Sequence, residues 1–291
     1  MRALIDGDMP AHEIGHLMVD TGMEDEQGNP IKKLLNVKEA IKIAVGRLMS
    51  IAINSEAGGY TVFLTGKNNF RDKLATILGY KANRAGADRG NVDKIKEHFH
   101  EIFGAIWCDG FEADDAMAME QWDDLLSVGG ESDPADWNED YLKDNASTVI
   151  ASRDKDLQTV PGWHYKWFVK LARKHDGGEI DPEEMRIEKG EVFWVSYVQA
   201  LRNFYAQMLT GDVSDNIPGL YKIGPKSAWV KQLDDMDDEQ EMYDHVQEKY
   251  YNYFKNHWRA FLLENARLLH MWRKPNDEWL PPDERDEDYW K

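Results

Sequence analysis

Carboxylates gather at four places in the sequence, each directly after an apolar run or a helical pattern. The eight residues are Asp6, Glu112, Asp114, Asp115, Asp154, Asp156, Asp212 and Asp215. Any one of these groups is more typical of a helix cap or a turn, because aspartate accepts hydrogen bonds from nearby backbone N–H groups. Brought together at one edge of a sheet, they would repel one another unless cations neutralised them. Oxygen ligands suit Mg²⁺ or Mn²⁺, and two such ions about 3.5–4 Å apart are the usual apparatus for hydrolysing a phosphodiester.

A second pattern points to different chemistry. His12, Glu13 and His16 spell H-E-x-x-H, which places two histidines on one face of a helix beside a glutamate, as in many zinc proteases. The longer form of that signature needs a glycine and a histidine further on, but Val19 and Gly22 stand at those positions. We therefore expect this helix to be scaffold behind the first strand, and keep a zinc protease only as an alternative function.

Apolar runs alternate with helical patterns through the first half of the chain. We predict buried strands at residues 2–6, 61–65, 105–108 and 148–152, and helices at 38–54, 91–103 and 113–126. This alternation indicates an α/β fold, with a sheet covered by helices on both faces. Ligands of such sheets bind outside the C-terminal ends of the strands, which is where the carboxylates fall.

The second half of the chain has a different character. Residues 191–209 predict one long aromatic helix, followed by a loop rich in glycine and proline at 210–226. An irregular insertion is expected at 127–147. The acidic end from Pro275 predicts a mobile tail. The predicted units are an α/β core at 1–190, a helical subdomain at 191–274 and an acidic tail at 275–291.

Composition and charge limit the function. The only cysteine among the 291 residues is Cys108, which excludes an internal disulfide and fits a cytoplasmic protein, in the host cytoplasm if the source is viral. No apolar stretch approaches the roughly 18 residues of a membrane span. The net charge of −19 argues against nucleic acid, because neutralising phosphates needs lysine and arginine. Basic islands at 67–98 and 163–175 oppose that argument, although the second is equally well explained as a surface element.

Five sequence blocks occur in an order that resembles the 5′-nuclease (flap endonuclease) family, especially the stand-alone bacteriophage 5′→3′ exonucleases. The blocks are LIDGD, FR…GYKANR, GFEADDAMA, ASRDKDLQTV and GDVSDNIPGLYKIGPKSA, and the similarity runs from Ala3 to about Leu233. The resemblance implies a PIN-like sheet flanked by helices, with a helical arch near 67–100. It also implies that the helical subdomain contains a helix–three-turn–helix element at about 203–233.

The resemblance also assigns the carboxylates to two Mg²⁺ or Mn²⁺ ions. The first ion would be held by Asp6, Glu112 and Asp114, and the second by Asp154, Asp156 and Asp215. The remaining two, Asp115 and Asp212, would bridge the ions or act through water. In one respect the chain departs from the family, which usually has another aspartate after the second strand. Thr65 and Gly66 stand there instead, and water or a nearby acid such as Asp8 would have to replace it.

The same resemblance assigns residues to DNA. Lys81 would contact the scissile phosphate, Arg84 would clamp a phosphate and Tyr80 would stack on the terminal base, with further charge from Arg89. Taken alone, these would be read as solvated helix residues and a core tyrosine. In the later loop the DNA-binding residues would be Gly219, Gly224, Lys226 and Ser227. There a helix beginning near Pro225 would attract a phosphate, and backbone carbonyls would bind K⁺.

The function implied is a metal-dependent 5′→3′ exonuclease or flap endonuclease that leaves 5′-phosphate products. Its catalytic residues would be Asp6, Lys81, Arg84 and Asp154. Its partners would be double-stranded DNA with a 5′ end or flap, and an RNA–DNA hybrid during primer removal. Because the net charge weakens DNA binding, a single-strand-binding protein or a polymerase is an expected partner. The other alternative is a catalytically impaired family member that only binds DNA, which the departure at Thr65 and Gly66 supports.

Overall fold

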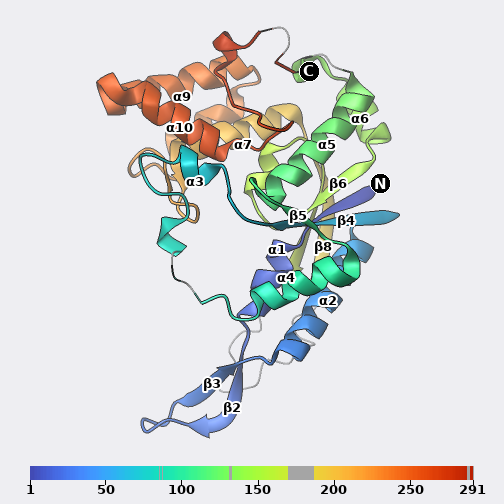
Figure 1. The fold of residues 1–291 in the computed structure, drawn as a ribbon. Coiled ribbons are helices and arrows are strands. Elements are labelled where there is room, and N and C mark those ends of the chain that lie inside the picture. The colour runs from blue at the N-terminus through green and yellow to red at the C-terminus, as the bar shows by residue number, and fades with distance from the viewer. Residues whose placement is uncertain (85, 87, 131–132, 170–186, 287–288, 291) are drawn as a thin grey trace.

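The structure, a computed structural model, describes residues 1–84, 86, 88–130, 133–169, 187–286 and 289–290. Within these residues a six-stranded sheet forms the centre (Figure 1). Its strands are β1 (Arg2–Asp6), β4 (Gly59–Thr65), β5 (Ile106–Cys108), β6 (Thr148–Ala151), β7 (Gly162–Val169) and β8 (Ile187–Val195). In the order β5-β4-β1-β6-β7-β8, neighbouring strands are parallel except that β8 runs antiparallel to β7. The four predicted strands are confirmed, and their common direction brings their C-terminal ends to one edge.

Helices cover both faces of the sheet, as predicted for an α/β fold (Figure 1). One face carries α1 (Asp8–Gly15), α2 (Val37–Asn54) and α4 (Val92–Phe103), and the other carries α5 (Ala113–Gly129) and α6 (Glu139–Asn145). Successive residues of β1 serve the two faces in turn. Ala3 and Ile5 join the core cluster under α1, α2 and α4, whereas Leu4 joins the cluster under α5. This alternation is the period of two that a strand imposes on its side chains.

A layer of helices lies beside the sheet (Figure 1). It comprises α7 (Tyr197–Thr210), α8 (Ala228–Gln232), α9 (Glu239–Phe254) and α10 (Trp258–Leu269), with the short α3 (Arg71–Leu74) against α10. Ser196 and Asp238 cap α7 and α9 by accepting backbone N–H groups. The layer has its own buried cluster of aromatic and aliphatic side chains. Among the described residues, none of the helices combines the length and the hydropathy of a membrane span.

Two sequence predictions of local structure are wrong. The long helix predicted at 191–209 begins only at Tyr197, because its first residues complete β8, where Trp194 pairs with Trp163 of β7. β-Branched and aromatic residues pack well on a neighbouring strand, and periodicity alone did not separate them from the helix that follows. The predicted irregular insertion at 127–147 contains the end of α5 and all of α6. The basic segment at 163–175 runs along β7 to Val169, and its remaining residues lie outside the described ones.

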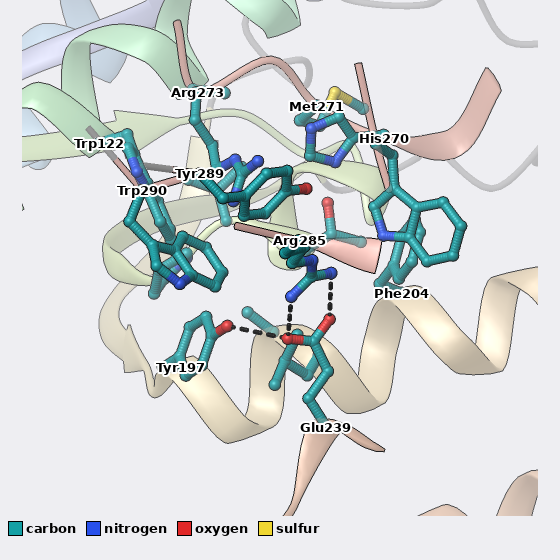
Figure 2. Close-up of a pocket in the computed structure, with 17 residues that line it drawn as sticks. Trp122, Tyr197, Phe204, Glu239, His270, Met271, Arg273, Arg285, Tyr289 and Trp290 are labelled. Atoms are coloured by element: carbon teal, nitrogen blue, oxygen red, sulfur yellow. Dashed lines mark hydrogen bonds and ion pairs between the residues drawn. The ribbon is translucent and has the colours of Figure 1, made fainter. Parts of the chain in front are cut away.

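The acidic tail packs on the body instead of extending as a mobile end. Trp279 is 2% exposed, and Arg285 donates to both carboxylate oxygens of Glu239 on α9 at 2.6 and 2.7 Å (Figure 2). Tyr289 and Trp290 lie beside Arg273, whose guanidinium carbon is 4.3 Å and 4.7 Å from their ring centres. The aromatic residues within the acidic composition explain the difference, because they give the tail an apolar face to bury.

A hairpin of β2 (Met18–Glu24) and β3 (Pro30–Leu34) projects from the body below α2 (Figure 1). It was not predicted, although Gly28 in its turn has the positive φ of 80° that favours glycine. A second small pair, β9 (Gly211–Asp212) and β10 (Ile217–Pro218), closes the loop that carries Asp215.

Candidate active site

The carboxylates from distant parts of the chain meet at the C-terminal edge of the sheet. Those lining one pocket are Glu112, Asp114, Asp154, Asp156 and Asp215. They come from the first turn of α5, from the loop after β6 and from the loop between β9 and β10. Asp6, the last residue of β1, is 4% exposed and close enough to affect the titration of Asp114. Parallel strands deliver their ends to one place, which explains why segments more than 200 residues apart converge.

Crowding of these acids shows in their protonation. Burial, followed by the charges of Asp8 and Asp154, raises the pKa of Asp6 to about 7. Burial and the neighbouring charges of Asp154 and Asp212 raise the pKa of Asp156 to about 8. The pKa of Asp114 is raised well above its ordinary value by burial and then by Asp6. Such shifts mean that the ionised cluster is unfavourable until positive charge is supplied.

Lysine ammonium groups supply part of that positive charge. Lys81 Nζ lies 2.5 Å from Glu112 and 3.6 Å from Asp215. Lys155 Nζ lies 3.2 Å from Asp212 and 3.6 Å from Asp156. Each ammonium therefore bridges two carboxylates from different segments. Lys81 occupies the pocket itself, whereas Lys155 lies beside it, at Asp156.

Residues between α3 and α4 also line this pocket and contact its carboxylates. Lys81 has the left-handed φ of 50°, and its backbone N–H donates to the Asp215 carbonyl at 3.0 Å, which holds the turn in place. Arg84 donates to Asp215 at 3.1 Å and is half-exposed. Tyr80 is 8% exposed, and its hydroxyl donates toward Glu112 at 2.8 Å and Asp215 at 2.7 Å. Its ring packs in the helical layer and Tyr80 also lines the pocket, so its stacking on a terminal base stays a prediction.

Two of the predicted metal residues have other partners. Asp115 is fully buried and pairs with Arg71, whose guanidinium donates to both of its oxygens. Asp212 is 2% exposed and accepts the backbone N–H of Ser214 at 2.6 Å. Burial opposes ionisation of Asp212, but hydrogen bonds from Ser214 and the charge of Lys155 lower its pKa to about 2. Asp212 therefore shapes the loop that presents Asp215, and Asp115 points away from the pocket.

The departure at Thr65 and Gly66 has a structural basis. The Thr65 hydroxyl accepts the backbone N–H of Ala113 at 2.9 Å and so caps the first turn of α5. A Cβ at position 66 would overlap the Asp109 carboxylate. Asp8 is the first residue of α1 and lies beside the end of β4, where its carboxylate accepts the Thr65 N–H at 3.1 Å. It is already paired with Lys96 at 2.7 Å, so the acid at this place carries its own counter-charge.

The predicted DNA-binding residues of the later loop lie apart from the acidic pocket. Gly219 packs against Gly211, where a side chain would overlap backbone atoms. Ser227 caps α8 by accepting the Val230 N–H at 3.3 Å, so this five-residue helix begins at Ala228, later than the sequence predicted from Pro225. Lys226 is exposed, and Gly224 has open space around it. In the earlier segment, Arg89 pairs with Asp93 on α4.

The H-E-x-x-H pattern begins in α1, where Ile14 is fully buried, but the helix ends at Gly15 and His16 is its C-cap. Its two histidine rings lie 6.0 Å apart. Glu13 is held by Arg47 at 2.6 Å and by Arg153, the residue before Asp154. A glutamate with two arginine partners is a structural anchor, unlike the free general base of a zinc protease.

Sequence reasoning missed two neutral residues that hold the acids. The Ser152 hydroxyl donates to Asp6 at 2.9 Å, and the Gln207 amide donates to Asp156 at 2.5 Å. Ser152 follows β6 directly, so the strand-end argument that selected the acids would also have selected it. Gln207 is a buried amide in the aromatic helix α7, and a lone polar residue among apolar neighbours is the signal that identifies it.

The donor set fits hard divalent cations. It consists of carboxylate oxygens, which Mg²⁺ and Mn²⁺ prefer. Burial, and then the neighbouring carboxylates, raise the pKa values of Asp6 and Asp156, so the ionised cluster would be stabilised by a cation. In the part of the chain that the structure describes, no three acidic, histidine or cysteine side chains already converge on one point as ion ligands. Four of the carboxylates, Glu112, Asp156, Asp212 and Asp215, are instead paired with Lys81 or Lys155.

Comparisons with known proteins bear on the fold. No known protein-family profile matches the sequence. A crystal structure of a bacteriophage T5 flap endonuclease, a pseudo-enzyme–product complex with DNA and metal ions, matches 92% of this chain and 88% of that chain, with a TM-score of 0.53 and 14% identity. Another T5 structure, co-crystallised with metal ions, covers the same shares at 15% identity, with a TM-score of 0.49. The protein therefore has the fold of a bacteriophage 5′-nuclease, with its mostly parallel six-stranded sheet flanked by helices.

Proposed function

We propose that this protein is a metal-dependent 5′-nuclease that hydrolyses DNA phosphodiesters from a 5′ end or at a flap. One observation carries the proposal: carboxylates from separate segments line a single pocket together with Lys81 and Arg84, which pair with two of them. A pocket that combines acids with exposed bases suits a phosphodiester. The acids would hold the metal ions that bind the phosphate, and the bases would neutralise the rest of its charge. The phage flap endonuclease with the same fold was crystallised with DNA and metal ions, which supports the same ligand classes here.

The residues have distinct roles in this proposal. Asp6, Glu112 and Asp114 would hold one Mg²⁺ or Mn²⁺ ion, and Asp154, Asp156 and Asp215 the other. When bound, two such ions lower the pKa of the attacking water and stabilise the leaving oxygen. Lys81 would leave Glu112 for the scissile phosphate, where its ammonium offsets the charge that develops during reaction. Arg84 is half-exposed beside it and would hold a second phosphate oxygen.

DNA would approach along the segments around this pocket. We propose that the segment between α3 and α4 passes over a 5′ end; α4 itself packs on the sheet, so this arch is shorter than the 67–100 that the resemblance implied. We also propose that α7, the loop at 210–226 and α8 act as the helix–three-turn–helix element on the duplex. Lys226 is exposed there, and a Cβ added at Gly224 would meet nothing within 4 Å, which leaves room for a contact with the phosphate backbone. K⁺ bound by carbonyls of this loop, RNA–DNA hybrids as substrates and a replication partner are further parts of the proposal. Products would carry 5′-phosphates, as suits phage-type replication or recombination.

A cleavage assay tests the proposal. The protein is freed of metal with EDTA and incubated with 5′-labelled duplex and flap DNA, with Mg²⁺, with Mn²⁺ and with neither. Cleavage is expected only with metal, and is expected to disappear in Asp154→Ala while surviving in His12→Ala. No cleavage with any metal would refute the nuclease function. Loss of activity in His12→Ala alone would move the site to α1.

The same assay decides whether the protein is an impaired nuclease that only binds DNA. The observation in favour of that candidate is the Thr65–Gly66 segment, whose nearest acid, Asp8, is already paired with Lys96. An impaired protein would bind flap DNA in a gel-shift measurement and leave it intact with both metals. Cleavage that depends on Asp154 excludes this candidate.

A further inference from the structure

The proposed reaction leaves one cation that lines the pocket, Arg71, without a role. Arg71 is 1% exposed, and its guanidinium donates to the two oxygens of Asp115 at 2.6 and 2.9 Å. Two further donors reach the last turn of α10: Nε to the Leu268 carbonyl and Nη2 to the His270 carbonyl, both at 2.9 Å. Arg71 thus joins the first turn of α5 to the end of α10. Only the planar fork of arginine reaches acceptors on both sides at once.

Asp115 passes this connection on to the pocket. It occupies the third position of α5, and its Oδ2 accepts the backbone N–H of Glu112 at 3.0 Å. The Glu112 carboxylate in turn lies 2.5 Å from Lys81 Nζ. Contacts therefore run from the carbonyls of α10 through Arg71 and Asp115 to the backbone of Glu112, whose carboxylate holds Lys81. Arg71 also reaches that carboxylate directly, at 3.8 Å.

Asp115 has no capacity left for an ion. It is fully buried, and it does not line the pocket. One oxygen receives Arg71 and the Trp272 N–H, and the other receives Arg71 and the Glu112 N–H. Removing either partner of such a buried pair leaves an uncompensated charge, so the two residues act as a unit.

We propose that Arg71 and Asp115 are a positioning pair, which orients Glu112 and Lys81 only when the end of α10 is docked against α5. Neither residue touches DNA or an ion. The consequence for cleavage rests on the proposed function, whereas the coupling between α10 and the pocket is a property of the metal-free protein. Trp272 stacks on Phe70 at 4.3 Å between centroids and completes the docked contact.

The test uses Arg71→Lys, which keeps the positive charge and removes the fork. Its matched control is Arg285→Lys. Arg285 also donates to both oxygens of one carboxylate, Glu239, and to one carbonyl, that of Leu280. It lines a different pocket, which residues of α7, Glu239 of α9 and the tail help to form (Figure 2). Both substitutions remove the same kind of buried two-point contact, so a difference between them reports position and not the general loss of an ion pair.

Hydrogen exchange measured by mass spectrometry on the metal-free proteins gives the first readout. Arg71→Lys is expected to raise exchange by about tenfold or more in residues 79–84 and 110–118, with β1 and β6 unchanged. Arg285→Lys is expected to leave both segments unchanged. A uniform rise over the whole chain would show a merely structural role, and no rise in the two segments would show no coupling. Either result overturns the proposal.

Single-turnover cleavage gives the second readout. Arg71→Lys and Asp115→Asn are expected to slow cleavage of bound DNA roughly 10- to 100-fold while the Kd for DNA changes by about twofold or less. The double variant should be no slower than the slower single variant, because the two residues act as one unit. Mn²⁺ affinity that falls in Asp115→Asn but not in Arg71→Lys would make Asp115 an ion ligand and refute the pair.

The two readouts separate the inference from the proposed function. If the wild-type protein cleaves no DNA while the exchange pattern is as expected, the nuclease function fails and the positioning pair stands. If the wild-type protein cleaves and Arg71→Lys cleaves equally fast, the positioning pair fails and the nuclease function stands.

Discussion

Gly66 lies where the loop after β4 passes against the loop after β5. Its N–H donates to the Cys108 carbonyl at 2.9 Å, and the next N–H, that of Lys67, donates to Asp109 at 2.8 Å. A Cβ at position 66 would overlap Asp109 and lie 2.8 Å from the Cys108 carbonyl oxygen. Glycine is thus required by the close approach of two loops, and the acid expected at this point has no room.

We predict that Gly66→Ala lowers the free energy of unfolding by about 1–3 kcal/mol, because the added methyl group forces the two loops apart. Gly66→Asp is expected to be at least as unstable and to gain no cleavage activity. Gly46→Ala is the control: a Cβ added at this exposed glycine in α2 would have nothing within 4 Å, and the change should stabilise by up to about 1 kcal/mol. Urea unfolding measures all three, and a Gly66→Asp variant that is more active would contradict the structure.

Lys81 and Lys226 are expected to act on different steps. Lys81→Met should lower the single-turnover cleavage rate by roughly 10²-fold or more, because its ammonium lies at the pocket where charge develops. Lys226→Met should weaken DNA binding equally for all sequences and reduce the slope of log K against log salt by about 1, without slowing cleavage of bound DNA. Rates and salt-dependent affinities of the two variants decide this, and equal effects on both quantities would remove the distinction.

Among the elements, α10 organises the loops around the pocket. Its Glu264 accepts the backbone N–H groups of Thr76 and Ile77 at 2.9 and 2.8 Å, in the segment that leads to Lys81. Its Asn265 donates to the Pro218 carbonyl, which lies in the pair that closes the Asp215 loop. One helix therefore contacts both the segment that leads to Lys81 and the strand pair that closes the Asp215 loop. The tail in turn covers α9 and α10, so it contributes to the same arrangement.

We predict that Trp279→Ala destabilises the protein by about 3–5 kcal/mol, since a fully packed indole is removed from the cluster beneath the tail. Tyr221→Ala, at a side chain that is 70% exposed, should change the stability by about 0.5 kcal/mol or less. Thermal or urea unfolding compares the two. Equal stability of Trp279→Ala and the wild-type protein would mean that the tail is detached in solution.

For the whole molecule, the net charge of −19 is concentrated in part at the sheet edge. The folded-state pKa values of Asp6 and Asp156, about 7 and about 8, lie above the ordinary value of 3.8. The folded protein therefore retains protons that the unfolded chain has already released over this interval. By linkage, these retained protons stabilise the folded protein. Their contribution to the free energy of unfolding is fully present below the unfolded pKa and is lost as the pH rises through the folded pKa.

We predict that in EDTA the free energy of unfolding decreases as the pH rises from 5 to 8, and that Mg²⁺ or Mn²⁺ removes much of the decrease by neutralising the ionised cluster. Asp6→Asn, which is neutral at every pH, should flatten the decrease without metal. Unfolding curves at several pH values measure the effect. A stability that increases between pH 6 and 8 in EDTA would contradict the raised pKa values.

Local structure was largely predictable from the sequence. The apolar runs at 2–6, 61–65, 105–108 and 148–152 form strands in the structure. They were recognisable because a short apolar run bounded by turn residues is typical of a buried strand. The strand-end rule placed most of the acids at one edge of the sheet. Hydrophobic periodicity did not separate the β-branched and aromatic run at 191–197 from the helix that follows it. Composition did not reveal that the acidic tail packs through its aromatic residues.

The sequence by itself thus determined the α/β class, the edge of the sheet where the acids meet and the chemistry they favour. The tertiary structure alone decided which acid faces the pocket. Asp114 and Asp115 are adjacent in sequence, yet one lines the pocket and the other pairs with Arg71, 44 residues away. Likewise Ser152 supports Asp6 from 146 residues away. The physical reason is that the direction of a side chain follows from its own helix, whereas its partner depends on how distant elements pack, and no local pattern records that packing.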